Sequence, residues 1–238
     1  MQILVVDQCS GSKRCPDWFN KLDADAIDTT SLQELQEREQ TPTYPARDLY
    51  TGRQQGYINS AVASLRDAGD EVDRLFISAG FGVVDEETNL VPYEVTFKDY
   101  SPEDIDNRAE QLRIQSDLLD RLENQYDIVF FALGSDYYRS FDLETVIDAI
   151  PDNTIVVLFN QETLASGRLN VVSISARTAE AAEQGAIVVG LKGRYLQQFA
   201  THRTNGAAVE SPEDVVEYCT REYTAQTGIG EFDDSGAG

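Results

Sequence analysis

Short apolar runs rich in valine and isoleucine recur along the chain, and turn residues bound each of them. Runs of this length and composition are typical of strands buried on both faces of a sheet. Segments with helical spacing separate the runs, and this order implies a mainly parallel sheet with right-handed crossovers. The predicted strands span residues 2–7, 73–79, 127–133, 154–159, 170–175 and 186–190.

The helix predicted over 102–124 has the clearest start of the segments between the strands. Ser101 precedes a proline at the first helical position, and two acidic residues follow in the first turn. The other predicted helices span residues 55–68, 136–149, 177–184, 193–202 and 212–226. The predicted fold class is therefore α/β, with three layers, about six mainly parallel strands and helices on both faces of the sheet.

The 238 residues suffice for one large or two small domains, and no linker divides them. We therefore predict a single domain over residues 1–228, followed by a disordered tail over 229–238. Residues 9–54 are long, polar and weakly periodic, so they are predicted to form an irregular excursion. A connection of this length within a domain is usually functional.

The chain has 42 acidic and 19 basic residues, a net charge of -23, and only four of its basic residues are lysines. An acidic excess with few lysines suits a salt-rich cytoplasm, where the repulsion between surface carboxylates is screened. We interpret the charge as halophilic adaptation. The total charge then does not exclude an anionic partner, and only a local basic cluster would indicate one.

Several classes of protein are disfavoured. No apolar stretch approaches the roughly 20 residues of a membrane helix, so no membrane partner is predicted. The start of the chain lacks the basic region of a signal peptide, and we expect a cytoplasmic protein. Cys9, Cys15 and Cys219 form no paired CxxC motif and His202 is the single histidine, which argues against a disulfide framework and metal sites. We predict no metal or cofactor, and His202 at a solvated helix end.

Candidate site residues follow the predicted strands, because ligands of open parallel sheets bind beyond the carboxyl ends. After the first strand, the backbone amides of Ser10, Gly11 and Ser12, together with Lys13, suit an anion cradle. The spacing differs from that of a P-loop, and a plain turn is the alternative. Cys9, beside basic residues, is a candidate nucleophile or redox thiol, or a small residue that fills the turn.

The loop after the second strand combines glycines with aromatic residues. Phe81 and Gly82 indicate a tight backbone path with a ring directed into the crevice. Tyr93 and Phe97 are predicted to sandwich a planar ring, and Glu94 to bond to that ring or to act as an acid or base. The alternative is a loop whose aromatic rings pack on the core.

Ser135 and Asp136 follow the third strand, where either residue can cap the next helix. Asp136 is also a candidate to stabilise an oxocarbenium ion or activate water, and Tyr137 is a candidate to stack on a base. Further basic and aromatic residues beside glycines or strand ends complete the predicted ligand-binding set: Arg47, Tyr50, Arg139 and Arg194.

Segments of the chain resemble the YaaA-like proteins, the superfamily of the bacterial peroxide stress protein. The resemblance lies in residues 75–97, in residues 130–141, where Asp136 replaces the family's glutamate, and in residues 192–195. The Cys9–Lys13 opening is also similar to the middle domain of archaeosine synthase, a tRNA-modifying protein with a uracil-DNA-glycosylase-like fold. The resemblance implies a three-layer α/β domain associated with nucleic acid or nucleotides.

Two functions follow as hypotheses. The first is an enzyme that acts on a nucleoside, a nucleotide or a base, at the N-glycosidic bond. The second is a non-catalytic module that binds nucleotides or nucleic acid, such as tRNA or DNA, in a modification or oxidative-stress system. A structural or oligomeric partner protein is the third alternative, and the sequence leaves the oligomeric state open.

Overall fold

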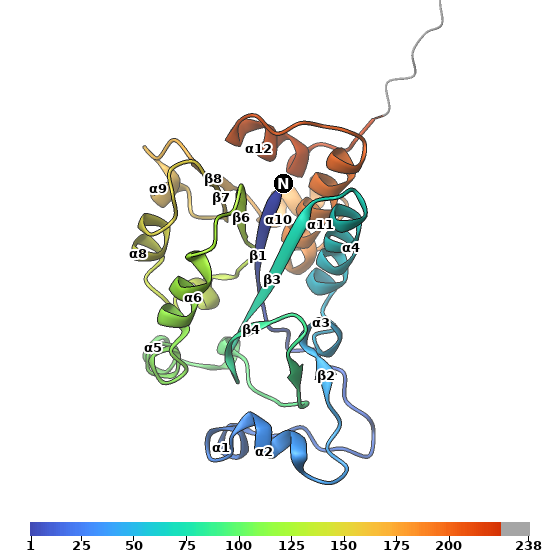
Figure 1. Ribbon diagram of the computed structural model, residues 1–238, viewed down its shortest axis with the longest axis vertical. Coiled ribbons are helices and arrows are strands. Elements are labelled where there is room, and N and C mark those ends of the chain that lie inside the picture. The colour runs from blue at the N-terminus through green and yellow to red at the C-terminus, as the bar shows by residue number, and fades with distance from the viewer. Residues whose placement is uncertain (225–238) are drawn as a thin grey trace, which may run out of the picture.

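The strand β1 (Gln2–Gln8) lies at the centre of the structure, because its apolar residues face both sides of the sheet. The computed structural model describes residues 1–224. Its main sheet has six strands in the order β4-β3-β1-β6-β7-β8, and helices cover both faces (Figure 1). The other strands are β3 (Glu71–Ser78), β4 (Gly82–Asp85), β6 (Ile128–Phe131), β7 (Ile155–Phe159) and β8 (Val171–Ile174).

The predicted α/β class with a mainly parallel sheet is confirmed. All neighbouring strands are parallel except β3 and β4, which form an antiparallel pair. The prediction of a strand over residues 186–190 is wrong, because helix α11 (Val188–Thr204) begins within that range. A short apolar run does not distinguish a buried strand from a helix. Here Val188 and Val189 are exposed, and β4 supplies the sixth strand.

Two hydrophobic cores lie on opposite faces of the sheet because side chains alternate along each strand. Leu4 and Val6 face one core, and Ile3 and Val5 face the other. The first core is covered by α5 (Pro102–Gln111), α6 (Ile114–Leu122), α7 (Ser135–Tyr138), α8 (Leu143–Asp148) and α9 (Glu162–Ala165). The second core is covered by α4 (Arg53–Asp67), α10 (Thr178–Glu183), α11 and α12 (Pro212–Thr220).

Two of the predicted helices are divided. The helix over 102–124 becomes α5 and α6, because Arg113 between them adopts a left-handed conformation with φ of 54°. The helix over 136–149 becomes α7 and α8, and Asp142 caps the second of these. His202 lies in the last turn of α11, as predicted, with its ring stacked on Tyr218.

The remaining predictions concern the end of the chain and the membrane. The helix predicted over 212–226 ends at Thr220. The tail predicted over 229–238 lies outside the described residues. Among residues 1–224, no helix combines the length and the apolar character that crossing a bilayer requires.

The excursion over residues 9–54 is an ordered layer below the carboxyl ends of β1 and β3 (Figure 1). It contains α1 (Ala24–Asp28), α2 (Leu32–Glu37), α3 (Ala46–Leu49) and β2 (Tyr44–Pro45). β2 pairs with β5 (Asn89–Leu90), which precedes the short 3₁₀ helix η1 (Phe97–Asp99). Backbone bonds from Leu22 N to Pro92 O and from Glu94 N to Leu22 O add to this attachment. The excursion therefore encloses one edge of the sheet.

A buried ion pair connects β1 to β3. The Asp7 carboxylate lies 2.7 Å from the Arg74 guanidinium, and both side chains are almost fully buried. Gln54 and Gln55, from the first turn of α4, donate to the same carboxylate at 2.7 and 3.3 Å. Asp7 is thus bonded to β3 and to α4, and these bonds hold the end of β1 in place.

Replacing Arg74 by methionine tests this role. The substitution leaves the Asp7 carboxylate buried without its counter-charge, so we expect a loss of about 3–5 kcal/mol in the free energy of unfolding. Urea denaturation at constant KCl measures the change. Arg121→Met is the matched control, because it removes an exposed ion pair with Asp85 and should cost less than about 1 kcal/mol. Equal losses in the two variants would contradict the assignment.

Candidate functional site

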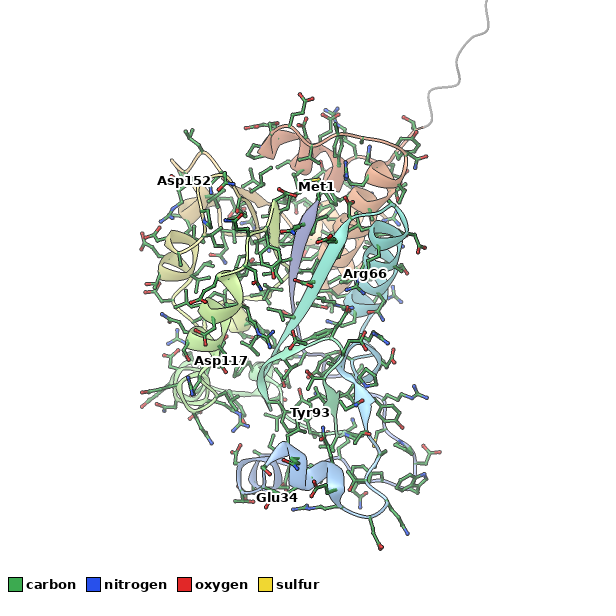
Figure 2. All side chains as sticks on the ribbon, viewed as in Figure 1. Met1, Glu34, Arg66, Tyr93, Asp117 and Asp152 are labelled. Carbon is green, nitrogen blue, oxygen red and sulfur yellow. The ribbon has the colours of Figure 1, made fainter. Side chains whose placement is uncertain are left out.

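A cluster of buried polar side chains lies where the carboxyl ends of β1 and β3 meet the excursion. We call it the Cys9–Lys13 cluster. Figure 2 shows Tyr93, one of its members, between the sheet and the excursion. Within a largely apolar surrounding, Cys9 bonds to Tyr137, Tyr93 bonds to Tyr50 and Ser78, and Lys13 lies over the Tyr93 ring. The members of the cluster come from five separate segments: Cys9, Lys13, Tyr50, Ser78, Tyr93 and Tyr137.

The thiol of Cys9 is directed inward and has a hydroxyl partner. The backbone amide of Cys9 donates to Ile77 O at 3.0 Å, which extends the pairing of β1 with β3 by one residue. Its Sγ lies 2.9 Å from the Tyr137 hydroxyl, and that hydroxyl is also 3.2 Å from Cys9 O. Only 2% of Cys9 is exposed. The thiol is therefore held in one orientation beside the Tyr137 hydroxyl.

Lys13 also turns into the cluster. Its backbone forms an antiparallel bridge with Tyr50, and its side chain is 8% exposed. The ammonium donates to Val95 O at 3.3 Å and lies 4.2 Å from the centre of the Tyr93 ring. An ammonium can donate three hydrogen bonds. Within residues 1–224 the Lys13 ammonium makes no ion pair, and Val95 O is the one acceptor to which it donates.

Burial sets the protonation of this amine. Loss of hydration lowers the pKa of Lys13 from its ordinary value of 10.5, Lys21 lowers it further, and the nearby Cys9 and Glu94 oppose the shift. The balance of these effects lowers the pKa of Lys13. Lys13 therefore gives up a proton more readily than a lysine in water.

The tyrosine hydroxyls form a chain of hydrogen bonds. The Tyr93 hydroxyl lies 2.9 Å from that of Tyr50 and 2.7 Å from Ser78 Oγ. Gly80 leaves space for the Tyr93 ring, since a Cβ at Gly80 would lie 2.6 Å from a ring carbon. Burial raises the pKa of the Tyr50 and Tyr93 hydroxyls, and likewise that of Tyr137, so these groups remain neutral donors.

The two rings predicted to sandwich a ligand, Tyr93 and Phe97, each pack against another aromatic ring instead. Tyr93 meets Phe81 edge to face, with ring centres 5.0 Å apart, and Phe97 meets Tyr137 at 5.2 Å. Tyr93 and Phe97 are fully buried, while Phe81 is half-buried. Of these rings, Phe81 is therefore the one with an exposed surface.

The two candidate carboxylates are less buried than the members of the cluster. The N-cap of α7 is Gly134, so neither Ser135 nor Asp136 caps this helix, and the Asp136 side chain is half-buried. Glu94 is exposed and lies near enough to Lys13 to raise the pKa of the amine. Asp136 directly precedes Tyr137, and Glu94 directly follows Tyr93. Both carboxylates are thus adjacent in the chain to members of the cluster.

The predicted first-loop residues lie on the outer side of the cluster. Gly11 and Ser12 are exposed, and Ser12 N donates to Ser10 Oγ at 3.1 Å. Ser10 lies against the start of α4, since a Cβ at Gly52 would be 2.5 Å from Ser10 Oγ. Gly82 has a different role, because its φ of 72° forms the turn between β3 and β4.

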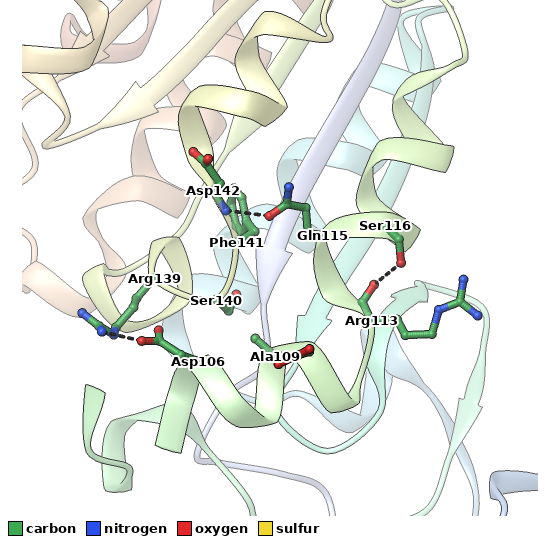
Figure 3. A pocket seen from close by; sticks show the side chains of 10 residues that line it. Asp106, Ala109, Arg113, Gln115, Ser116, Arg139, Ser140, Phe141 and Asp142 are labelled. Carbon is green, nitrogen blue, oxygen red and sulfur yellow. Dashed lines mark hydrogen bonds and ion pairs between the residues drawn. The ribbon is translucent and has the colours of Figure 1, made fainter. Parts of the chain in front are cut away.

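The three predicted arginines are each paired with an acid instead. Arg47 pairs with Glu87, Arg139 with Asp106 at 2.6 Å, and Arg194 with Glu222 at 3.0 Å. Arg139 lines a separate hollow of about 380 Å³ between α5, α6 and residues 139–142 (Figure 3). Among the described residues, none of the three bonds to the Cys9–Lys13 cluster. Complementary surface charges explain these arginines without a ligand.

Sequence reasoning did not assign Ser78, which bonds Tyr93 and also accepts from the amides of Gly80 and Phe81. Its place at the end of a predicted strand was the available signal. Within residues 1–224, no group of three or more histidine, cysteine, aspartate or glutamate side chains is arranged to hold a metal ion.

Neither a protein-family model nor a curated protein sequence matches this chain. The resemblance to the YaaA-like proteins therefore stays a prediction.

The lowered pKa of Lys13 can be tested by pulse acetylation across pH 7–11. Because only the neutral amine reacts, the midpoint of Lys13 labelling should lie below 10.5 in the folded protein and return to that value in urea. Peptide mass spectrometry measures the label. Cys9→Ser should move the midpoint further down, since it removes the neighbour that opposes the lowering of the Lys13 pKa. A midpoint unchanged by urea would contradict the assignment.

Proposed function

We propose that the protein is an enzyme that acts on a nucleoside, a nucleotide or a base, and that the reacting bond is N-glycosidic. The observation that supports this most is the Cys9–Lys13 cluster, a desolvated amine and an oriented thiol at the carboxyl edge of a parallel sheet. Ligands of such sheets bind at this edge. Two carboxylates, the exposed Glu94 and the half-buried Asp136, lie next to members of the cluster in the chain.

The groups present suit acid–base cleavage. Asp136 or Glu94 stabilises the cationic sugar carbon, or takes a proton from the attacking water. The bond from this carbon to the base nitrogen breaks as the bond to the water oxygen forms. Lys13 gives its proton to the departing base, a step that its lowered pKa favours. Cys9 is the alternative nucleophile, with Tyr137 as the partner of its thiol.

A ligand the size of a nucleotide is favoured over a long nucleic acid. Affinity for a phosphate backbone depends on several unpaired cations. Arg47, Arg139 and Arg194 already pair with carboxylates and so do not supply such a cluster of free cations.

The second candidate function is a non-catalytic module that binds a nucleotide or nucleic acid in a modification or stress system. The mutual bonding of the Tyr50 and Tyr93 hydroxyls favours it, because these bonds hold the excursion to the sheet without a substrate. Binding of ligand without turnover would distinguish this candidate from the enzyme.

The enzyme is tested by incubating the protein with pooled nucleosides, nucleotides and tRNA in molar KCl and measuring released base by mass spectrometry. On the substrate found, Asp136→Asn should lower kcat by about 10²–10⁴, the usual contribution of acid–base catalysis. Asp152→Asn, which changes an exposed carboxylate lining a hollow with Met1, should leave kcat unchanged.

A second pair of variants examines the thiol. Cys9→Ser should lower turnover, whereas Cys15→Ser should not, because the Cys15 thiol bonds only to carbonyl oxygens of its own loop. Full activity in both Asp136→Asn and Glu94→Gln would remove the carboxylate step. If no nucleoside, nucleotide or tRNA is changed by the wild-type protein, the proposed activity is wrong.

A further inference from the structure

Most basic side chains of this protein form ion pairs with carboxylates, and a few do not. Twelve of the fifteen arginines form ion pairs with carboxylates, whereas none of the four lysines does so within residues 1–224. With 42 acidic residues available, an unpaired cation that is also withdrawn from water is unexpected. Lys192 is such a cation.

Lys192 lies on the second turn of α11, on the opposite face of the sheet from Lys13. The neighbouring glycines bring α11 close to the first turn of α4. A Cβ at Gly193 would lie 2.6 Å from Gln54 O, and a Cβ at Gly190 would lie 3.2 Å from Arg53 Cγ. Gln54 in turn donates to Asp7 and to Ala132 O. These contacts place Lys192 at the carboxyl edge, near the ends of β1 and β6.

The ammonium of Lys192 has no bonding partner there. It makes no hydrogen bond or ion pair with any described residue, and its side chain is half-buried. Burial lowers the pKa of Lys192, and the nearby Asp7 only partly restores it. The Asp7 carboxylate is already bonded by Arg74 and by both glutamines. The amine is therefore partly withdrawn from water and lacks an available counter-charge.

Arg53 adds a second cation at the same place. It is the first residue of α4, is exposed, and forms no ion pair or hydrogen bond with the described residues. Its side chain lies against Gly190, two residues before Lys192. Two cations without ion pairs thus belong to adjacent first and second turns of two packed helices, α4 and α11, in a strongly acidic protein.

We propose that Lys192 and Arg53 bind the phosphate group of a nucleotide. A phosphate supplies the counter-charge that Lys192 lacks, and Arg53 can donate two parallel hydrogen bonds to it. The N-terminus of α4, which begins at Arg53, carries the positive end of the helix dipole and also attracts a phosphate. This inference rests on the proposed function and narrows it, because it selects a nucleotide over a nucleoside or a free base as the ligand.

The experiment compares the dissociation constants of inorganic phosphate, a nucleoside 5′-monophosphate and the matching nucleoside by calorimetry. It uses the lowest KCl concentration at which the wild-type circular dichroism is unchanged. Lys192→Gln should weaken binding of the monophosphate and of phosphate by about tenfold or more and leave nucleoside binding unchanged. Arg53→Gln should act in the same direction. Lys98→Gln, which removes an exposed lysine in η1, is the matched control and should change nothing.

The outcomes separate this inference from the proposed function. Wild-type affinity for phosphate and monophosphate in both Lys192→Gln and Arg53→Gln would overturn the subsite. The same holds if the wild-type protein binds neither anion. Phosphate binding that depends on Lys192, in a protein that releases no base from any substrate, would retain the subsite and reject the glycosidic activity.

Discussion

The buried pair of Asp7 and Arg74 determines where the chain goes after β1. Asp7 is the last residue of the strand with a fully buried side chain on the α4 face, and it is bonded from β3 and from α4 together. A charge in this position needs all its partners, since an unpaired buried carboxylate is costly. Because these bonds hold the end of β1, Cys9 follows in register with β3 and its thiol meets Tyr137.

The excursion turns this edge into an enclosed site. Its backbone bonds to residues 86–94, and its side chains Lys13 and Tyr50 complete the polar cluster. A sheet edge open to water would hydrate the amine and leave its pKa near the ordinary value. Covering the edge with polypeptide desolvates Lys13 on one face, and the packing of α11 on α4 does the same for Lys192 on the other. Two perturbed amines therefore lie on either side of β1.

The predicted site residues fall into two groups when compared with the structure. Cys9, Lys13, Tyr50, Tyr93 and Tyr137 come together, because the rule that ligands bind at the carboxyl ends of parallel strands depends only on topology. Arg47, Arg139 and Arg194 do not join them. Their long side chains turn to the nearest carboxylate, and that choice depends on neighbours that are distant in the chain. Lys192 was visible in the sequence, but nothing there showed that it would lack a partner.

The amino-acid sequence by itself determined the α/β class, the mainly parallel sheet and five of its six strands, since apolar periodicity and β-branched composition are local properties. It did not determine that Val188 and Val189 begin a helix, because a short apolar run suits either structure and the choice depends on packing against α4. Only the tertiary structure decided which charges are paired and which are desolvated. Burial and ion pairing are made by residues far apart in the chain, and no local pattern records them.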